Sequence, residues 1–347
     1  MKKTILILII FLGFFLRVYK LDQYPLGFTW DEAALGYNAY SILKTGKDEY
    51  GSVLPLIFKS FGDYKPGLYV YLTVPWILIL GLNEFAVRLP SAIFGTLTVL
   101  IFYLLLREKS IRSFLKIEFG GNSEYSALAS LFLLAVSPWH VYFSRGAWEL
   151  NVMLFEIVFG IFLLLKYLKE KKRLWLYLSE SVLIASLFTY QSAKLLVPLL
   201  LFGFSFFFRK EIFAAKLKEK KVFLTSFLLI YFFFNLITLF GGKAGRIKVM
   251  SIFSYPRSQE ESEMFLKQDG NSSLRYRFFH NDFVFFLRSV LGRYFNHFSG
   301  KFLFISGDWS NPRNGTIYQG VLYYPDLIFL IWGLIILFGK KRTALEN

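Results

Sequence analysis

Nine apolar segments separated by short charged runs constrain the fold of this chain more than any other feature. They cover residues 4–18, 66–82, 86–106, 124–142, 148–165, 174–190, 195–208, 222–240 and 321–339. Several approach the roughly 20 residues with which a helix crosses the hydrocarbon core of a bilayer. With 55% hydrophobic and 20% aromatic residues, the chain is typical of a multispanning membrane protein. The expected fold is therefore an all-α, polytopic membrane helix bundle.

Basic residues between the apolar segments predict the topology. They occupy residues 107–116, 166–173, 209–221 and 340–342, with Lys2 and Lys3 at the start. Cytoplasmic loops carry such runs, and all of these runs share one side only if segment 66–82 does not cross. We therefore expect about eight transmembrane helices in a single domain, 1–347, with both termini inside. The first outer loop, 19–85, would hold interfacial helices, and a second outer loop would cover 241–320.

The net charge of +16 follows from these loop runs, so we expect no nucleic-acid partner. A basic patch on a soluble fold, which nucleic-acid binding requires, is absent from the pattern. The chain contains no cysteine, which excludes disulfides and thiolate metal sites. The apolar stretch after Met1 has no small-residue cleavage site, and we expect it to remain as an uncleaved first span in the cell membrane.

The segment 29–46, directly after the first span, carries the strongest candidate for chemistry. Thr29 and Glu32 have the spacing of a helix capping box, and Gly46 suits the end of that helix. The capping box would use the side chain of Glu32, but Glu32 is kept with Asp31 as a candidate catalytic residue. Asp31 in the first turn has no capping duty, and it is a candidate general base.

Further charged residues would gather with Asp31 on the outer face. The candidate donor-phosphate ligands are Lys65, Lys194, Arg145 and Arg88, and Glu149 is a second candidate catalytic acid. Carboxylates could deprotonate an acceptor hydroxyl, and cations could stabilise a phosphate leaving group. The alternative for the lysines is snorkelling at the membrane surface. The alternative for Arg145 and Glu149, four residues apart, is a plain ion pair.

Two other features bear on chemistry. Glu156 lies inside an apolar segment, and an intramembrane carboxylate is a functional-site hypothesis by default. The three histidines, His140, His280 and His297, have no ligand spacing, so they predict no metal site. The cofactor therefore stays unknown at this stage.

Several motifs together resemble the GT-C glycosyltransferases. The resemblance is closest to the bacterial and archaeal proteins grouped with dolichyl-phosphate-mannose protein mannosyltransferases and with the aminoarabinose transferase of lipid A. The matching stretches, which extend over nearly the whole chain, are 17–46, Tyr64-Lys-Pro-Gly-Leu-Tyr, 83–91, 137–145, Thr189-Tyr-Gln-Ser-Ala-Lys and 297–308. Each motif is modest by itself, and their order is the more specific signal.

The resemblance implies a transferase that uses a polyprenyl-phosphate sugar donor on the outer membrane face and inverts the anomeric carbon. The acceptor would be a lipid, a glycan or a protein. Asp31 matches the catalytic aspartate of the family, and Lys65 matches a lysine that meets the donor phosphate. Glu149 stands where relatives carry a second acid, and Lys194 where many carry arginine.

The chain also departs from the family pattern. Tyr64 replaces the glutamate that ligates a metal in the aminoarabinose transferase, although Asp63 is adjacent. Relatives continue with more spans after Gly320, so this chain would be a short member, a truncated product or half of a split one. Two alternatives to the transferase remain: a membrane transporter or lipid flippase, and an inactive truncated homologue.

Overall fold

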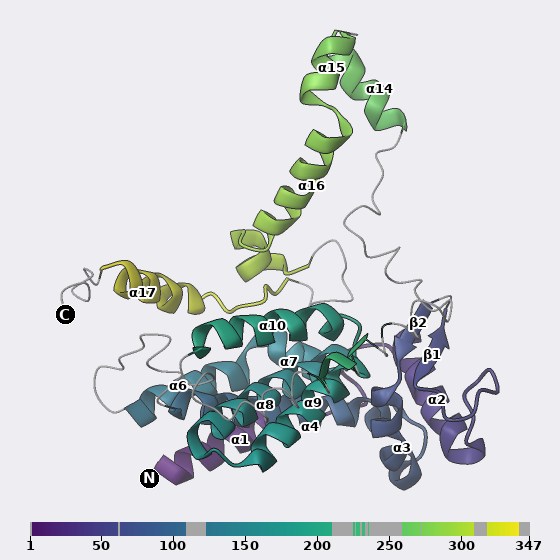
Figure 1. Cartoon of the computed structure of the whole chain (residues 1–347), viewed down its shortest axis with the longest axis vertical. Coiled ribbons are helices and arrows are strands. Elements are labelled where there is room, and N and C mark those ends of the chain that lie inside the picture. Colours follow the sequence, from purple (N-terminus) through teal and green to yellow (C-terminus); the bar gives the residue numbers. More distant parts are fainter. Residues whose placement is uncertain are drawn as a thin grey trace. The chain divides into compact units, whose positions relative to one another are not determined.

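The computed structural model describes residues 2–61, 63–108, 123–209, 259–270, 272–308 and 318–339, with a few positions between 225 and 235. The described chain is mostly helical and forms two compact units, 1–244 and 245–347 (Figure 1). Most of the basic runs used for the topology, and most of the predicted span 222–240, lie outside the described residues.

The first unit contains nine helices and one hairpin in its described residues. The helices are α1 (Lys2–Val18), α2 (Trp30–Thr45), α3 (Leu68–Leu80), α4 (Glu84–Arg107), α6 (Ser123–Val136), α7 (Pro138–Arg145), α8 (Glu149–Glu170), α9 (Arg173–Leu187) and α10 (Ala193–Phe207). Strands β1 (Ile57–Ser60) and β2 (Asp63–Pro66) pair antiparallel, with Phe58 opposite Lys65.

The second unit contains four α-helices and a π-helix in its described residues. They are α14 (Gln259–Gln268), α15 (Ser273–Phe279), α16 (Asp282–Asn296), the π-helix Lys301–Ser306 and α17 (Asp326–Gly339). Helices α14, α15 and α16 lie within the stretch 241–320, which the sequence analysis treats as the second outer loop.

Helix α4 is central to the packing of the first unit, because α1, α3, α6, α7 and α8 all pack against it. Helix α8 packs in turn along α9 (Figure 1). Buried hydrogen bonds support the crossing of α4 and α8, where Asn151 Nδ2 donates to the Ser91 carbonyl at 2.7 Å and to Ser91 Oγ at 3.2 Å. Such polar contacts hold apolar helices together where neighbouring lipid would be equally apolar.

Fewer helices are long enough to cross a membrane than the sequence predicted. Among the described residues, α4 and α8 are long and apolar enough, and the bent pair α6–α7 makes a third if it is one span. The expectation of about eight spans is therefore wrong for this part of the chain. The reason is length: α9 and α10 have 15 residues each, or about 22 Å, against a core of about 30 Å.

Helix α3, which was expected to lie at the interface, has 13 residues with Pro75 inside it. Its length of about 20 Å is short of a full crossing. The interfacial location stays a prediction.

Gly95 allows the closest approach in this helix packing, and it gives a stability prediction. A Cβ at position 95 would clash with Ser144 Oγ and would lie 3.0 Å from Asn151 Nδ2. We expect Gly95→Ala to lower the free energy of unfolding by about 1–3 kcal/mol, as overpacked cores do. Thermal unfolding of the purified protein in detergent measures this change.

Gly203→Ala is the matched control. Gly203 also lies in an apolar helix, α10, but nothing lies within 4 Å of a Cβ added there. Alanine should be neutral or slightly stabilising at this position, because it favours the helix over glycine. Equal unfolding midpoints for the two variants would contradict the assignment of Gly95 as a packing contact.

Candidate functional site

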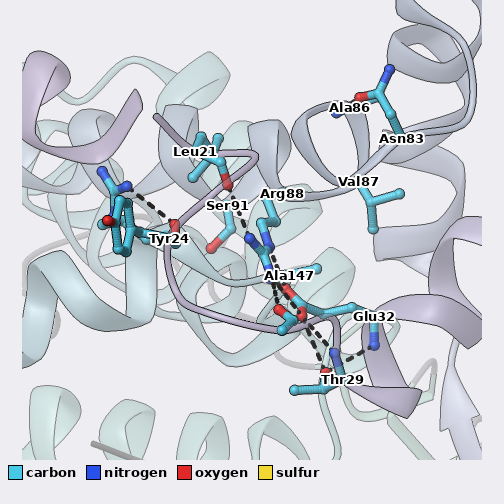
Figure 2. Close-up of polar contacts among 12 residues, drawn as sticks. Leu21, Tyr24, Thr29, Glu32, Asn83, Ala86, Val87, Arg88, Ser91 and Ala147 are labelled. Atoms are coloured by element: carbon cyan, nitrogen blue, oxygen red, sulfur yellow. Dashed lines mark hydrogen bonds and ion pairs between the residues drawn. The ribbon is translucent and has the colours of Figure 1, made fainter. Parts of the chain in front are cut away.

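The start of α2 positions the predicted acidic pair, and its capping box is confirmed. Glu32 N donates to Thr29 Oγ1 at 3.2 Å, and Thr29 N donates to Glu32 Oε2 at 3.0 Å (Figure 2). At the other end of the helix, Gly46 adopts the left-handed conformation with φ 70°. The cap holds the first turn in place without using Asp31, so the Asp31 side chain is available for another role.

Glu32 also forms a buried ion pair that the sequence did not predict. Arg88 Nε donates to Glu32 Oε1 at 2.8 Å, and Arg88 Nη2 donates to Glu32 Oε2 at 3.2 Å. The backbone N–H of Ala147 donates to Glu32 Oε1 at 3.0 Å (Figure 2). Both carboxylate oxygens are thus occupied, and only 4% of Glu32 is exposed. We assign Glu32 to structure rather than to catalysis.

The two predicted phosphate-binding arginines hold the loop 19–29 by its backbone. Arg88 donates to the carbonyls of Leu21 at 3.0 Å and Gly27 at 2.6 Å (Figure 2). Arg145 donates to the carbonyl oxygens of Leu16, Tyr19, Lys20 and Tyr24. A phosphate would have to displace these contacts, so we leave Arg88 and Arg145 out of the site.

Asp31 forms an ion pair with Lys65, which is 34 residues away in sequence. Lys65 Nζ lies 2.5 Å from Asp31 Oδ1, with side-chain exposures of 10% and 30%. Lys65 comes from β2, so the hairpin carries the ammonium to the first turn of α2. The sequence expectation that these two residues lie together is met by this geometry, whereas their chemical roles stay predictions.

The ion pair lines a small hollow that contains other polar groups. Ser60 and Asn38 line it together with Asp31 and Lys65, and its apolar lining comes from Ala34, Leu35, Phe58, Pro66 and Val70. Ser60 Oγ is buried and has no hydrogen-bond partner among the described residues. A hydroxyl beside an ion pair offers both a donor and an acceptor to a sugar.

Sequence reasoning missed Ser60 and Asn38. Asn38 Nδ2 donates to Glu49 Oε1 at 2.9 Å, and Glu49 N donates to Asn38 Oδ1 at 3.1 Å. These contacts fix the loop after α2 against the helix. Ser60 enters the hollow because β1 pairs with β2 in the observed register, and no spacing in the sequence specifies that register.

Lys194 lies at the start of α10, on a segment that adjoins β2. Gln191 Nε2 donates to the Tyr64 carbonyl at 3.0 Å, and Leu68 N donates to the Phe188 carbonyl at 2.9 Å. Burial lowers the pKa of Lys194 from 10.5 to about 8. The turn 188–194 thus runs beside Tyr64, the neighbour of Lys65.

Glu149 lies at a different place from the Asp31–Lys65 pair. It is buried in the first turn of α8, and it does not line the hollow. Burial raises the pKa of Tyr69 well above its usual value, and the charge of Glu149 raises it further. Glu149 therefore lies near Tyr69 of α3, and its predicted catalytic role gains no support from this placement.

A divalent metal does not fit the described residues. The metal-ligating glutamate of the resembled family corresponds to Tyr64, whose carbonyl accepts the Gln191 amide. No group of three or more His, Asp or Glu side chains in the described ranges could hold a metal ion.

No protein-family model matches this chain, and no curated protein matches its sequence. The resemblance to GT-C glycosyltransferases thus depends on the motifs alone.

Proposed function

We propose that the chain is an integral-membrane glycosyltransferase of the GT-C type. It transfers a sugar from a polyprenyl-phosphate donor to an acceptor hydroxyl on the outer face of the cell membrane, with inversion at the anomeric carbon. The observation that carries the proposal is the ion pair between Asp31 and Lys65 at 2.5 Å. This contact brings a carboxylate and an ammonium group together at the start of a capped helix, and these are the two kinds of group that the proposed reaction uses as base and as phosphate ligand.

The reaction assigns one step to each group. The Asp31 carboxylate takes the proton of the acceptor hydroxyl as its oxygen attacks the anomeric carbon. The bond from that carbon to the phosphate oxygen breaks on the opposite side, which inverts the centre. The electron pair leaves with the polyprenyl phosphate, and the ammonium groups of Lys65 and Lys194 stabilise its charge.

This displacement requires Lys65 to change partners. A base and a leaving-group cation act on opposite sides of the anomeric carbon, so Lys65 must leave Asp31 as the donor phosphate enters. A lysine suits this exchange because its ammonium is a point charge on a flexible stem. The incoming phosphate then replaces Asp31 as the counter-ion, and the carboxylate becomes available to the acceptor.

Lys194 gives the proposal a pH dependence. Lysine binds a phosphate as the ammonium, and burial lowers the Lys194 pKa to about 8. Donor binding should be strongest below that pKa and should weaken as the pH rises through it. We expect the dissociation constant of a fluorescent prenyl-phosphate sugar to rise up to about tenfold between pH 7 and 9.

The Lys194→Arg variant is the matched control for this pH series. Arginine keeps its charge throughout this range, because its pKa stays above 12. The variant should bind the donor with an affinity that changes little over the same pH series. If the donor affinity of the parent protein also changed little over this pH series, Lys194 would not belong to the donor site.

The direct test of the function is transfer itself. We expect prenyl-phosphate glycans to co-purify with the protein, and mass spectrometry would identify the donor sugar. Vesicles containing only this protein should then move labelled sugar from that donor to an acceptor. Absence of both the bound glycan and the transfer, in preparations that retain a cooperative unfolding transition, would reject the glycosyltransferase.

A transporter is the second candidate function, and Glu156 is the observation that favours it. Glu156 lies in α8, one of the helices long enough to span, and it is 6% exposed. Its Oε2 has no hydrogen-bond partner among the described residues. Ionisable groups inside membrane helices often mark transport pathways.

Glu156→Gln separates the two functions. Glutamine keeps the size of the side chain and removes its charge, so sugar transfer should stay within about twofold of the parent rate, because Glu156 does not line the hollow beside Asp31 and Lys65. Transfer assays in vesicles measure this rate. Loss of lipid or solute movement in the variant, with no transfer activity in the parent, would favour the transporter.

A further inference from the structure

Helix α16 presents a continuous apolar face that no described residue of its own unit covers. Five large apolar side chains on it are 43–70% exposed: Phe283, Leu287, Leu291, Tyr294 and Phe298, the last just beyond the helix end. At about 100° per residue these positions fall within an arc of about 80°. No residue of α16 is fully buried.

The side of α16 away from the arc has partners within the second unit. Phe285 and Ser289 line a pocket together with Phe265 of α14 and His280, and Val284 and Arg288, which flank the arc on one side, line it as well. His280 stacks on Phe265 and hydrogen-bonds to Asp269 Oδ2 at 2.7 Å. One side of the helix therefore packs on its neighbours, and the apolar arc stays exposed in the described part of the second unit.

Basic residues beside the arc indicate the kind of surface that covers it. Arg288 and Arg293 are exposed, and they lie about 100° and 120° from the centre of the arc, one on each side. Between residues 273 and 301 there are five Lys or Arg residues and a single Asp. Arginine stems can cover apolar surface while their guanidinium groups reach lipid phosphates.

We propose that α16 lies flat in the interfacial layer of a membrane that contains anionic lipid. Its apolar arc enters the acyl boundary, and Arg288 and Arg293 bind headgroup phosphates on either side. The pattern of aromatic and leucine residues on one face, with arginines beside them, is that of an interfacial amphipathic helix. The 15 residues of the helix, about 22 Å long, are too short to span. This inference is independent of the proposed glycosyltransferase activity.

The absence of cysteine from the chain permits a direct test on the full-length protein. Single cysteines replace Leu287 or Leu291 on the arc, or Gly292 on the other side, where nothing lies within 4 Å of an added Cβ. Each carries a nitroxide, and the protein is reconstituted in vesicles of phosphatidylcholine with phosphatidylglycerol. Spin-label power saturation then compares access by oxygen, which enriches in lipid, with access by a water-soluble nickel chelate.

We expect the labels at 287 and 291 to be reached by oxygen and shielded from nickel, and the label at 292 to show the reverse. Equal access by nickel at all three positions would place α16 in water. Shielding from both reagents at 287 and 291 would mean that protein, from this chain or a second copy, covers the arc. Either result overturns the proposal.

The arginines provide the second measurement. In the Leu287→Cys background, Arg288→Glu with Arg293→Glu should raise nickel access at position 287 severalfold on vesicles that contain phosphatidylglycerol. On vesicles of phosphatidylcholine alone, the change should be smaller, because the zwitterionic headgroups give the membrane no net negative charge to attract arginine or repel glutamate. An identical change on both kinds of vesicle would reject the role of anionic lipid.

Discussion

Replacing Asp31 with asparagine should lower sugar transfer about 10²–10⁴-fold, the usual loss when a general base is removed. Asparagine keeps the shape of the side chain but cannot take the proton of the acceptor hydroxyl. The fold should be unaffected, because Thr29 and Glu32 form the cap of α2. Lys65 is largely buried and loses its counter-ion in this variant, so we also expect a loss of about 1–3 kcal/mol in stability, limited by the hydrogen bond that the asparagine amide oxygen can accept from the ammonium.

The measurement is the initial rate of transfer in vesicles, with thermal unfolding in parallel. Asp22→Asn is the matched control, because Asp22 is an exposed carboxylate a few residues before α2. The control should transfer at the parent rate. An Asp31→Asn variant that also retains the parent rate would show that the base, and with it the proposed mechanism, is wrong.

Replacing Arg88 with methionine should cause the largest loss of stability. Arg88 is fully buried, and it joins Glu32 to the carbonyls of Leu21 and Gly27. The variant leaves the Glu32 carboxylate buried without its counter-ion, which costs about 3–5 kcal/mol in other proteins. The loop 19–29 also loses two hydrogen bonds, so we expect a lower unfolding midpoint and a loop that proteases cut more readily.

A double-mutant cycle identifies the cause of that loss. Removing Glu32 as well, in Glu32→Leu with Arg88→Met, should destabilise less than the sum of the two single changes, because no uncompensated charge remains. Lys169→Met is the surface control, since Lys169 pairs with Glu108 at 65% side-chain exposure. The control should lie within about 1 kcal/mol of the parent. Additive effects of Glu32 and Arg88 would contradict the pair as the source of stability.

Sequence reasoning was most accurate where a feature depends on neighbouring residues. The capping box of Thr29 and Glu32 and the left-handed Gly46 were both predicted, because caps are set by residues three or four positions apart. The helical, membrane-compatible nature of the chain followed from its apolar segments. The number of spans did not, because helix ends and bends decide length: α6 and α7 meet at 52°.

Charged residues showed the limit of the same reasoning. Lys65, Arg88 and Arg145 look alike in sequence, as cations of one outer face. The structure separates them, because Lys65 meets Asp31, whereas Arg88 and Arg145 hold backbone carbonyls of the loop 19–29. A buried guanidinium with several fixed donors suits carbonyls in a loop, and which cation becomes buried is set by helix packing.

The sequence alone therefore determined the local elements: a capped α2 with Asp31 in its first turn, and apolar helices. It predicted an all-α chain and did not predict the strand β2 that carries Lys65. Only the tertiary structure decided which charges meet, because Asp31 and Lys65, or Glu32 and Arg88, are 34 and 56 residues apart. Contacts within one turn of a helix follow from backbone geometry. Contacts over such separations depend on how α2, α4 and the β1–β2 hairpin pack together.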